Sequence, residues 1–442
     1  MPRLLTFDHF YGQDLDALEA AGGGDWEIVR IPYQRIHRLA RRHFPRDAFA
    51  DVRSSADPAL TPNWQSYRAA VERHARWLTT AHRPNLFVIP SDTIFYFRPY
   101  IESFRALGLR TVVVQKETTI SPMTMEIDSR HVAEAVPFMA DLMTVCSERH
   151  RRFWLGQGVR HDLVVVTGQP RFDVYAHPVP DRPAGTRPRL LYFSYDDFAY
   201  LPYDGRTTPL GDWTELRRET ETALGELASS GTWEVVAKMH PQQVSLRNWL
   251  GPDVVHAPTT GDTRDIIRAA DLVVGFQTTG LFEAALAGKP VVYPAWGSVF
   301  ERAHELLVPF EHYDDLVQHV TSRDELLAVL ADGDRARHLP GDRARAAATE
   351  HLGPVDGGAS DRVLALLADE VRPVPATTPP FRPVGRALLL GAAAPALVVL
   401  AGAARRSRRP AIADALVRRS MHWRAEGREA RVVLTRLSTR RR

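Results

Sequence analysis

The stretch that decides the fold is Ala270–Trp296, which reads ADLVVGFQTTGLFEAALAGKPVVYPAW. It predicts a buried strand, a small polar loop, a helix, a glycine-lysine-proline turn and a second strand. The loop Gln277–Gly280 lies at the start of the helix, where free backbone N–H groups favour an anion such as a diphosphate. Glu283 follows one turn later on the same side of the helix surface, where its carboxylate can accept two ribose hydroxyls. The pattern therefore predicts a nucleotide site with Glu283 as a helix-surface carboxylate; the alternative is a capped helix with an ordinary glutamate.

The same alternation of apolar runs and amphipathic stretches continues on both sides of this segment. Continuous Val, Ile and Leu runs separated by helices predict parallel sheets that are covered on both faces. The proline-rich segment Val179–Pro188 divides the alternation into two halves, and a ligand cleft is expected between the carboxyl ends of their strands. We therefore predict an α/β fold with two doubly wound, Rossmann-like domains. The expected boundaries are residues 1–178 and 189–350 for the two domains, 351–372 for a closing helix, 373–386 for a linker and 387–442 for an extension.

The composition restricts the class of protein. The chain has 442 residues, of which 44% are hydrophobic and 25% charged, as in soluble globular proteins. These values argue against wholesale disorder and against a protein with many membrane spans. The single cysteine, Cys146, cannot form an internal disulfide and favours a reducing compartment. No basic and apolar signal segment follows Met1, so we expect a cytoplasmic protein.

The C-terminal extension has a membrane-binding pattern. Ala387–Ala404 is 18 residues without a polar side chain, which as a helix spans roughly 27 Å, near the lower limit for a bilayer. From Arg405 onward the chain carries 13 arginines and three acidic residues. Ile412–Leu437 mixes arginine with apolar residues, as a helix on anionic lipid does. We expect both ends on one side of the membrane, with a bend at Pro395. This predicts a monotopic or peripheral protein on the cytoplasmic face of an anionic membrane, with no nucleic-acid partner; the alternative is an ordinary helix packed on the body.

The segment Glu283–Val292 resembles the nucleotide-binding segment of GT-B fold glycosyltransferases and of the related non-hydrolysing UDP-GlcNAc 2-epimerases. In those families the small polar loop contacts the donor diphosphate and the glutamate holds the ribose. The resemblance implies that Thr278, Thr279 and Gly280 bind phosphate, that Gln277 belongs to the same donor loop, and that Glu283 binds ribose.

Three further elements resemble the CDP-glycerol glycerophosphotransferase branch, which makes teichoic acids. Val236–Pro241 is similar to its K-x-H-P motif, so Lys238 and His240 are expected to end a strand at the cleft. There they would neutralise a leaving nucleotide diphosphate; the alternative is a structural histidine before a turn. Thr167–Asp173 resembles a T-G-x-P-R-x-D element, from which we take Arg171 as acceptor-binding. Asp356–Val363 resembles the D-G-x-A-S-x-R element that opens the last helix.

The first half differs from both families at the end of the run Thr111–Val114. The glycerophosphotransferases have an H-G-T-P motif there, and this chain has Gln115–Thr119, without a histidine. Glu117 is the preferred base that would deprotonate an acceptor hydroxyl, and Asp92, after a neighbouring strand, is the second choice. Lys116 would bind an acceptor phosphate or lower the pKa of the carboxylate. The alternatives are a surface pair for Lys116 and Glu117 and a helix cap for Asp92.

These observations predict a GT-B transferase that moves a sugar from a nucleotide diphosphate donor to a lipid-linked or cell-surface glycan acceptor. Three alternatives stay open: a polyol-phosphate transferase, a UDP-sugar 2-epimerase, and a non-catalytic scaffold that binds nucleotide sugars. Neither a metal nor another cofactor is expected. The 17 histidines show no zinc-like spacing, and no phosphate-binding loop of the ATP or NAD type follows a strand.

Overall fold

A computed structural model gives the structure of most of the chain. It describes residues 1–8, 11–49, 56–116, 121–177, 186–201, 210–240, 243, 248–258, 262–313, 315–331, 342–374 and 391–401, together with 416, 417, 419–421, 423, 424 and 427–432.

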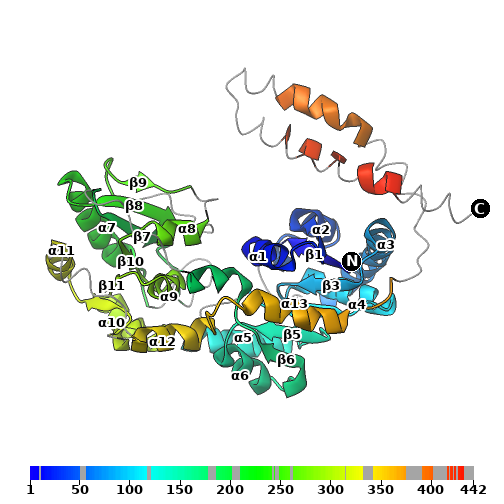
Figure 1. The fold of residues 1–442 in the computed structure, drawn as a ribbon, viewed down its shortest axis with the longest axis horizontal. Coiled ribbons are helices and arrows are strands. Elements are labelled where there is room, and N and C mark those ends of the chain that lie inside the picture. Colours follow the sequence, from blue (N-terminus) through cyan, green and yellow to red (C-terminus); the bar gives the residue numbers. More distant parts are fainter. Residues whose placement is uncertain are drawn as a thin grey trace, which may run out of the picture.

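The first sheet has six parallel strands in the order β2-β1-β3-β4-β5-β6 (Figure 1). The strands are β1 (Arg3–Asp8), β2 (Glu27–Pro32), β3 (Leu86–Ile89), β4 (Thr111–Val114), β5 (Leu142–Val145) and β6 (Val164–Val166). The helices between them are α1 (Gly12–Gly22), α2 (Tyr33–Ala40), α3 (Thr61–His82), α4 (Arg98–Ala106), α5 (Pro122–Glu134) and α6 (Glu148–Gly156). Phe87 and Ile89 pack into a core on one face, and Leu86 and Val88 into a core on the other. This two-sided burial explains the continuous apolar runs.

The second sheet repeats this architecture, with six parallel strands in the order β12-β11-β10-β7-β8-β9. The strands are β7 (Arg189–Ser194), β8 (Glu234–Met239), β9 (Val255–His256), β10 (Leu272–Gly275), β11 (Val291–Pro294) and β12 (Gln318–Val320). The helices are α7 (Thr214–Ser229), α8 (Thr263–Arg268), α9 (Gly280–Leu286), α10 (Ser298–Ala303), α11 (Arg323–Ala331) and α12 (Asp342–Leu352). The expectation of two parallel, doubly wound sheets is confirmed.

Each sheet has one point at which the chain changes the direction in which it adds strands. In the first sheet this point lies between β1 and β3, and in the second between β7 and β10. Ligands of open α/β sheets bind outside the carboxyl ends of the strands at such a point. Gln277–Gly280 follows β10 directly, and His240 follows β8. The fold therefore places the predicted donor residues at the edge of the second sheet where a ligand is expected.

The last helix of the body, α13 (Ala359–Glu370), returns to the first sheet (Figure 1). Val363 and Leu367 are fully buried in the same core as Leu86 and Val88. The sequence elements Thr167–Asp173 and Asp356–Val363 meet here. Asp173, in η6 (Pro170–Ala176), accepts hydrogen bonds from the backbone N–H groups of Ala359 and Ser360 at 2.9 and 2.8 Å, which cap the start of α13.

A glycine allows these two elements to approach closely. Gly168 has a φ of +79°, and a Cβ added there would lie 2.9 Å from the carbonyl oxygen of Pro354. Arg362, from α13, also donates through Nε to the carbonyl of Thr167 at 2.7 Å. The spacing of the two elements in the sequence thus reflects a contact that ties the closing helix to the end of the first domain.

The described part of the C-terminal extension folds back onto the first domain (Figure 1). Glu429 accepts hydrogen bonds from Arg35 of α2 at 2.8 Å and from the indole N–H of Trp77 of α3 at 3.0 Å. His82 Nε2 lies 3.2 Å from the same carboxylate. Ala430 is fully buried in the core of the first domain. Within the described residues, none of the helices combines the length and apolarity needed to span a bilayer.

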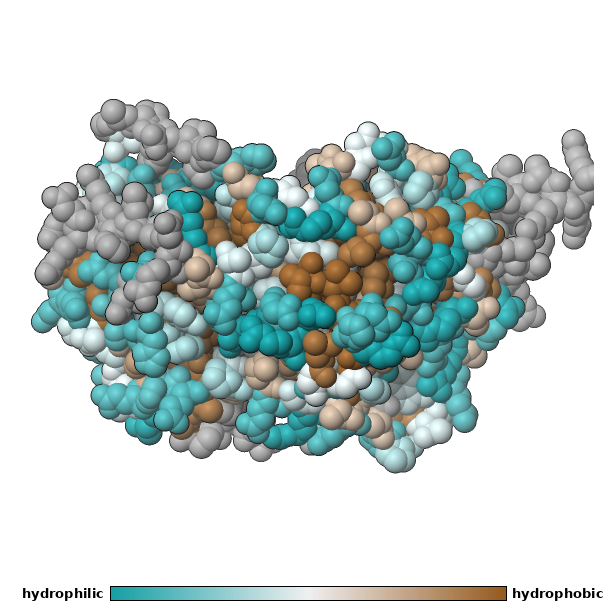
Figure 2. Space-filling model, turned by 60° about the horizontal axis from the view of Figure 1, so that its bottom comes forward, coloured by the Kyte–Doolittle hydropathy of each residue, from teal (hydrophilic) through white to brown (hydrophobic). Residues whose placement is uncertain are grey.

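Large exposed hydrophobic side chains concentrate in this extension. Eight are found in the described residues, and five of them belong to the extension: Val398, Val399, Leu400, Met421 and Val432. The face of the molecule in Figure 2 is mostly hydrophilic, with hydrophobic residues gathered near its middle. The extension thus differs from the body, because it is attached by buried residues and still presents apolar side chains to solvent.

Candidate functional site

Cationic side chains from both sheets come together at the ends of β4 and β8. Lys238, the penultimate residue of β8, is 4% exposed, and its ammonium donates to the carbonyl of Pro258 at 3.2 Å. Burial lowers the pKa of Lys238. His240 is exposed; partial burial lowers its pKa, and the positive charges of Lys116 and Lys238 lower it further. Lys116 follows β4 of the first sheet, so the site is built from both domains.

Two of the three lysines in the whole sequence stand in this cationic group, which consists of Lys116, Lys238 and His240. A compact ammonium is a strong point-charge partner for phosphate. The lowered pKa of His240 means that its imidazole is mostly neutral while no anion is bound. A diphosphate would oppose the charges of the two lysines and raise that pKa again, so that His240 can donate a proton or a charged hydrogen bond.

Glu283 is buried, at 6% exposure, and the expectation of a helix-surface glutamate is therefore wrong. The hydroxyl of Tyr175 donates to Glu283 Oε2 at 2.8 Å. Arg171 Nη2 lies 3.9 Å from Glu283 Oε1, which is too long for a hydrogen bond. Burial raises the pKa of Glu283, while the charge of Arg171, the Tyr175 hydrogen bond and the charge of Arg264 lower it. The second oxygen of the carboxylate keeps capacity to accept a hydrogen bond.

The guanidinium of Arg171 lies beside Glu283, the predicted ribose-binding residue, and the acceptor-binding role of Arg171 stays a prediction. Its guanidinium approaches Glu283, and its backbone N–H donates to Asp14 of α1 at 3.1 Å. Arg264 of α8 donates to the carbonyl of Arg171 at 3.1 Å. The segment that contains Arg171 therefore bridges the first domain and the second. Tyr175, Asp14 and Arg264 are not among the predicted site residues, because no local pattern in the sequence links them to partners that are 108, 157 and 93 positions away.

The loop after β10 is held by Gln277, which has a φ of +52° and is 1% exposed. Its amide donates to Tyr293 Oη at 2.9 Å and to the carbonyl of Val308 at 2.7 Å, and accepts from the N–H of Val308 at 2.9 Å. The side-chain amide of Gln277 thus holds the loop in place, with its nitrogen and oxygen both bonded within the protein. The two following threonines, Thr278 and Thr279, are half-buried and remain candidates for donor contacts.

Packing explains why a glycine stands at position 280. A Cβ at this position would lie 2.7 Å from the ring of Phe193, which is the penultimate residue of β7. A glycine therefore lets α9 start directly against the neighbouring strand at the switch point, and this brings Glu283 to its buried place.

The two candidate bases differ in what the structure shows. Asp92 is fully buried, and its Oδ2 accepts hydrogen bonds from the backbone N–H groups of Met139 at 2.7 Å and Ala140 at 3.1 Å. Burial raises the pKa of Asp92, and these hydrogen bonds oppose the shift. Through Oδ2, Asp92 holds two chain segments together, while its Oδ1 is buried and has no hydrogen-bond partner among the described residues. Its role as the second-choice base stays a prediction. Glu117 lies outside the described residues, so its role as the base stays a prediction.

The acidic pair Asp196-Asp197 has a structural partner, since Asp197 lies 2.8 Å from buried Arg217. In the part of the chain that the structure describes, no group of three or more His, Cys, Asp or Glu side chains could hold a metal ion. Gln115, which follows β4, accepts a hydrogen bond from Trp154 at 3.2 Å. An amide at this place cannot perform acid–base chemistry.

No protein-family model matches this chain, and no curated protein matches its sequence. Solved structures do match. A protein from Listeria monocytogenes, named as a UDP-N-acetylglucosamine 2-epimerase, superposes with a TM-score of 0.50 at 16% identity, over 85% of this chain and 99% of that one. S. aureus MnaA in a structure with UDP gives 0.50 at 14% identity, over 83% and 96%. The wall teichoic acid polymerase TagF, soaked with CDPG, gives 0.52 at 9% identity, over 84% and 88%. The chain has a GT-B-type fold. At these identities the likeness concerns the fold alone.

Proposed function

We propose that the protein is a nucleotide-diphosphate-dependent transferase that moves a sugar to a lipid-linked or cell-surface glycan acceptor. The observation that carries this proposal is the cationic group Lys116, Lys238 and His240, which gathers at the ends of β4 and β8 from the two sheets. The buried carboxylate of Glu283 lies on α9, which begins after β10 of the second sheet. The fold supports the proposal, because the similar structures include one with UDP and one soaked with CDPG.

In this proposal Glu283 binds the ribose of the donor. Oε2 of its carboxylate is oriented by Tyr175, and Oε1 accepts no hydrogen bond from a described residue. A ribose hydroxyl can therefore donate to Oε1 without displacing Tyr175. Burial raises the pKa of Glu283, and the positive charge of Arg171 opposes this rise and so favours the charged carboxylate. Thr278 and Thr279 lie one turn earlier, on the phosphate side of the ribose.

The cationic group acts in the chemical step. As the bond between sugar and diphosphate breaks, negative charge grows on the departing phosphate. Preorganised positive charge stabilises that transition state more than it stabilises the bound donor. Lys238 is held in place by Pro258, and His240 becomes protonated when the diphosphate is present. Glu117, next to Lys116, takes the proton of the acceptor hydroxyl.

One experiment separates this function from the alternatives. The protein is incubated with a panel of UDP-, CDP- and GDP-sugars and CDP-glycerol, with and without membrane extract. A sugar transferase releases nucleoside diphosphate only when an acceptor is present, and a polyol-phosphate transferase releases nucleoside monophosphate. An epimerase changes the sugar nucleotide without acceptor, and a scaffold binds without turnover. Conversion of a sugar nucleotide to its epimer in the absence of extract would overturn the proposal.

We also propose that the extension attaches the protein to the cytoplasmic face of an anionic membrane. Val398, Val399 and Leu400 are 43%, 70% and 55% exposed on one helix, and Arg424 and Arg428 are exposed on the adjoining segment. Apolar side chains beside arginines fit the interface of an anionic bilayer. Because the extension is fixed to the first domain, such attachment would hold the cleft near a lipid-linked acceptor.

Truncation is a poor test of this attachment, because Glu429 and Ala430 are buried against the first domain. The double substitution Val399→Asp and Leu400→Asp changes only exposed positions. We expect it to abolish co-sedimentation with vesicles of phosphatidylglycerol. Val255→Asp, at an exposed valine of the second domain, is the matched control and should bind as the wild type does. Equal sedimentation of the double variant and the control would contradict the proposal.

A further inference from the structure

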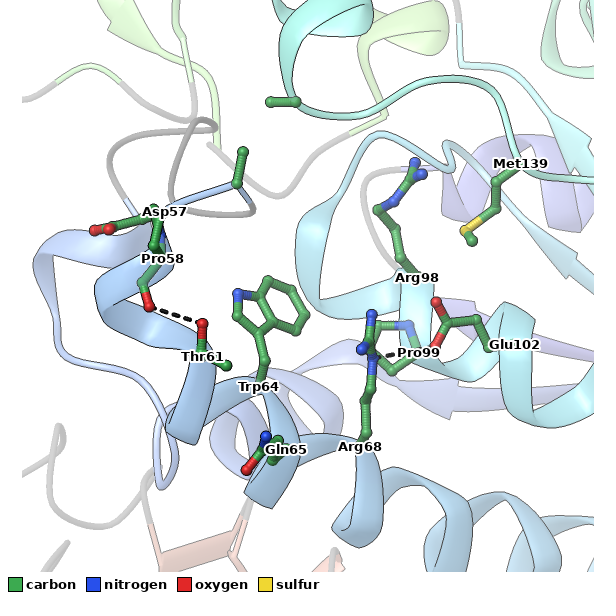
Figure 3. Close-up of a pocket in the computed structure, with 12 residues that line it drawn as sticks. Asp57, Pro58, Thr61, Trp64, Gln65, Arg68, Arg98, Pro99, Glu102 and Met139 are labelled. Carbon is green, nitrogen blue, oxygen red and sulfur yellow. Dashed lines mark hydrogen bonds and ion pairs between the residues drawn. The ribbon is translucent and has the colours of Figure 1, made fainter.

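A pocket of about 390 Å³ lies in the first domain and shares no residue with the site around Glu283. It is formed by the first turns of α3 and α4, by the short η3 (Pro58–Leu60), and by residues that follow α5, including Met139 (Figure 3). Its volume falls in the range of about 300–1,000 Å³ that is usual for ligand sites. The function proposed above does not use it.

One side of the pocket presents an arginine with unused donors. Arg98 Nη1 donates to the carbonyl of Asp92 at 3.0 Å, and no carboxylate among the described residues lies within ion-pair distance of its guanidinium. Burial lowers the pKa of Arg98, and the charges of Asp92 and Glu102 oppose this. A guanidinium has five N–H donors in a fork that matches a carboxylate or phosphate. A half-buried arginine without an ion pair, at the wall of a pocket, is well suited to an anion.

The opposite side presents an aromatic platform. Figure 3 shows the Trp64 ring across the pocket from Arg98. The ring makes edge contacts with Phe44 and Phe95, at centroid distances of 4.8 and 5.9 Å, and the guanidinium carbon of Arg68 lies over it, 5.9 Å from its centroid. Its indole N–H is buried and has no hydrogen-bond partner within the described ranges. A flat apolar face with an unused donor at its edge suits a sugar ring, which has apolar C–H faces and hydroxyls at its rim.

The mouth of the pocket is polar. Arg68 lies 3.3 Å from Glu102, and both side chains are exposed, at 58% and 41%. Such a pair is weak and leaves donors and acceptors for hydroxyl groups. Asp57 also lines the pocket, but its carboxylate caps η3 by accepting from the N–H of Ala59 at 2.8 Å, and Figure 3 shows it turned away from the space between Trp64 and Arg98.

Asp92 connects this pocket to the edge of the sheet. Its carboxylate accepts from the N–H of Met139, a lining residue, and its carbonyl accepts from Arg98. Asp92 follows β3, the strand beside β4, after which Lys116 lies. Asp92 is thus a positioning residue for the pocket, because it fixes the lining residue Met139 and orients Arg98.

We propose that this pocket binds the phosphate-bearing sugar of the acceptor, with the anionic group on Arg98 and the sugar ring against Trp64. The assignment to an acceptor rests on the transferase function proposed above; the binding of an anionic sugar does not. The shared chemistry, a sugar with a phosphate on it, occurs in a soluble sugar phosphate and in a prenyl-diphosphate-linked sugar.

Calorimetry of the full chain with three ligands tests the proposal. The ligands are N-acetylglucosamine 1-phosphate, N-acetylglucosamine, and a short prenyl diphospho-N-acetylglucosamine in micelles. The best-binding nucleoside diphosphate is present at saturation, so that the site around Glu283 is occupied. We expect the phosphorylated probes to bind at least about tenfold more tightly than the neutral sugar, since hydrogen bonds to charged groups are roughly twice as strong as neutral ones. The tighter of the two phosphorylated probes identifies the source of the acceptor.

Arg98→Gln should weaken binding of the phosphorylated probes at least about tenfold. Because Arg98 also contacts Asp92, a second variant leaves the fold untouched: Gln65→Glu adds a negative charge at an exposed lining residue. Its control, Ala69→Glu, adds the same charge one turn further along α3, outside the pocket lining, and should bind as the wild type does.

Equal binding of phosphorylated and neutral sugar, or unchanged binding in both Arg98→Gln and Gln65→Glu, would overturn the proposal. The two proposals can fail separately. A protein that binds nucleoside diphosphates but no anionic sugar refutes the pocket alone, and a protein with the opposite behaviour refutes the donor site alone.

Discussion

The substitution Glu283→Gln changes the charge of the proposed ribose-binding residue and keeps its shape. In the structure the carboxylate is 6% exposed, accepts from Tyr175 and faces Arg171. A hydrogen bond to a charged acceptor contributes about 1.5–3 kcal/mol, roughly twice the value for a neutral one. Two ribose hydroxyls would therefore lose about 1–3 kcal/mol in the variant, so the dissociation constant should rise about tenfold to a hundredfold.

Isothermal titration calorimetry with UDP, CDP and GDP at neutral pH measures this effect, and thermal unfolding shows that the variant is folded. Glu305→Gln, which makes the same change at an exposed glutamate of the second domain, is the matched control. A folded Glu283→Gln variant that binds the best nucleotide within about twofold of the control would refute the reasoning, since a twofold change corresponds to less than about 0.5 kcal/mol.

The pH dependence gives a second readout of the same residue. Burial raises the pKa of Glu283 above its ordinary value of 4.5. The carboxylate is charged well above the raised pKa and becomes protonated as the pH falls through it. Nucleotide affinity of the wild type should therefore weaken on acidification at a higher pH than an exposed glutamate would give, and Glu283→Gln should lack this component. The nucleotide titrates in both proteins, so the difference between their profiles isolates Glu283.

Three other predictions concern different parts of the molecule. Arg35 and the other partners of Glu429 hold the pKa of its carboxyl well below the ordinary value of 4.5, so the stabilisation that this charge gives is present above pH 4.5 and is lost as the pH falls from there through the lowered pKa. Glu429→Gln should lower the free energy of unfolding by about 3–5 kcal/mol at neutral pH and by less in acid, as measured with denaturant. Gly168→Ala should destabilise the protein by more than about 1 kcal/mol, and Gly158→Ala, which has φ of +78° and open space, should cost less; equal losses would contradict the crowding argument. His240→Ala should lower kcat more than it raises KM for the donor, and a change in KM alone would remove it from the chemical step.

The fold could be predicted because its signals are local. Apolar runs of four to six residues, separated by amphipathic stretches, specify buried parallel strands with helices between them. Lys238 and His240 could be predicted because they stand at the end of a strand, and Gly280 because it ends the loop that follows one. In parallel sheets the carboxyl ends of neighbouring strands lie at one edge. A residue at the end of a strand can therefore be predicted to lie near the ligand, even when the order of the strands in the sheet is not known.

The remaining features depend on contacts that no local pattern encodes. The burial of Glu283 comes from Tyr175, 108 positions away, and the attachment of the extension comes from Glu429 and Arg35, which are 394 positions apart. Asp92 follows a strand, which is why the sequence predicts a base there, and its contacts with the N–H groups of the segment before β5 follow from no local pattern. A polar residue at a strand end can serve the site or hold the chain around it, and only the surrounding packing decides between the two.

A crystal structure of the protein with the tightest-binding nucleoside diphosphate tests the central claim most directly. The account predicts the ribose hydroxyls within hydrogen-bonding distance of Glu283, and the phosphates within reach of Lys238 and His240, with Lys116 facing them from the first domain. A nucleotide that binds with its ribose away from Glu283, or with its phosphates away from Lys238 and His240, would contradict it.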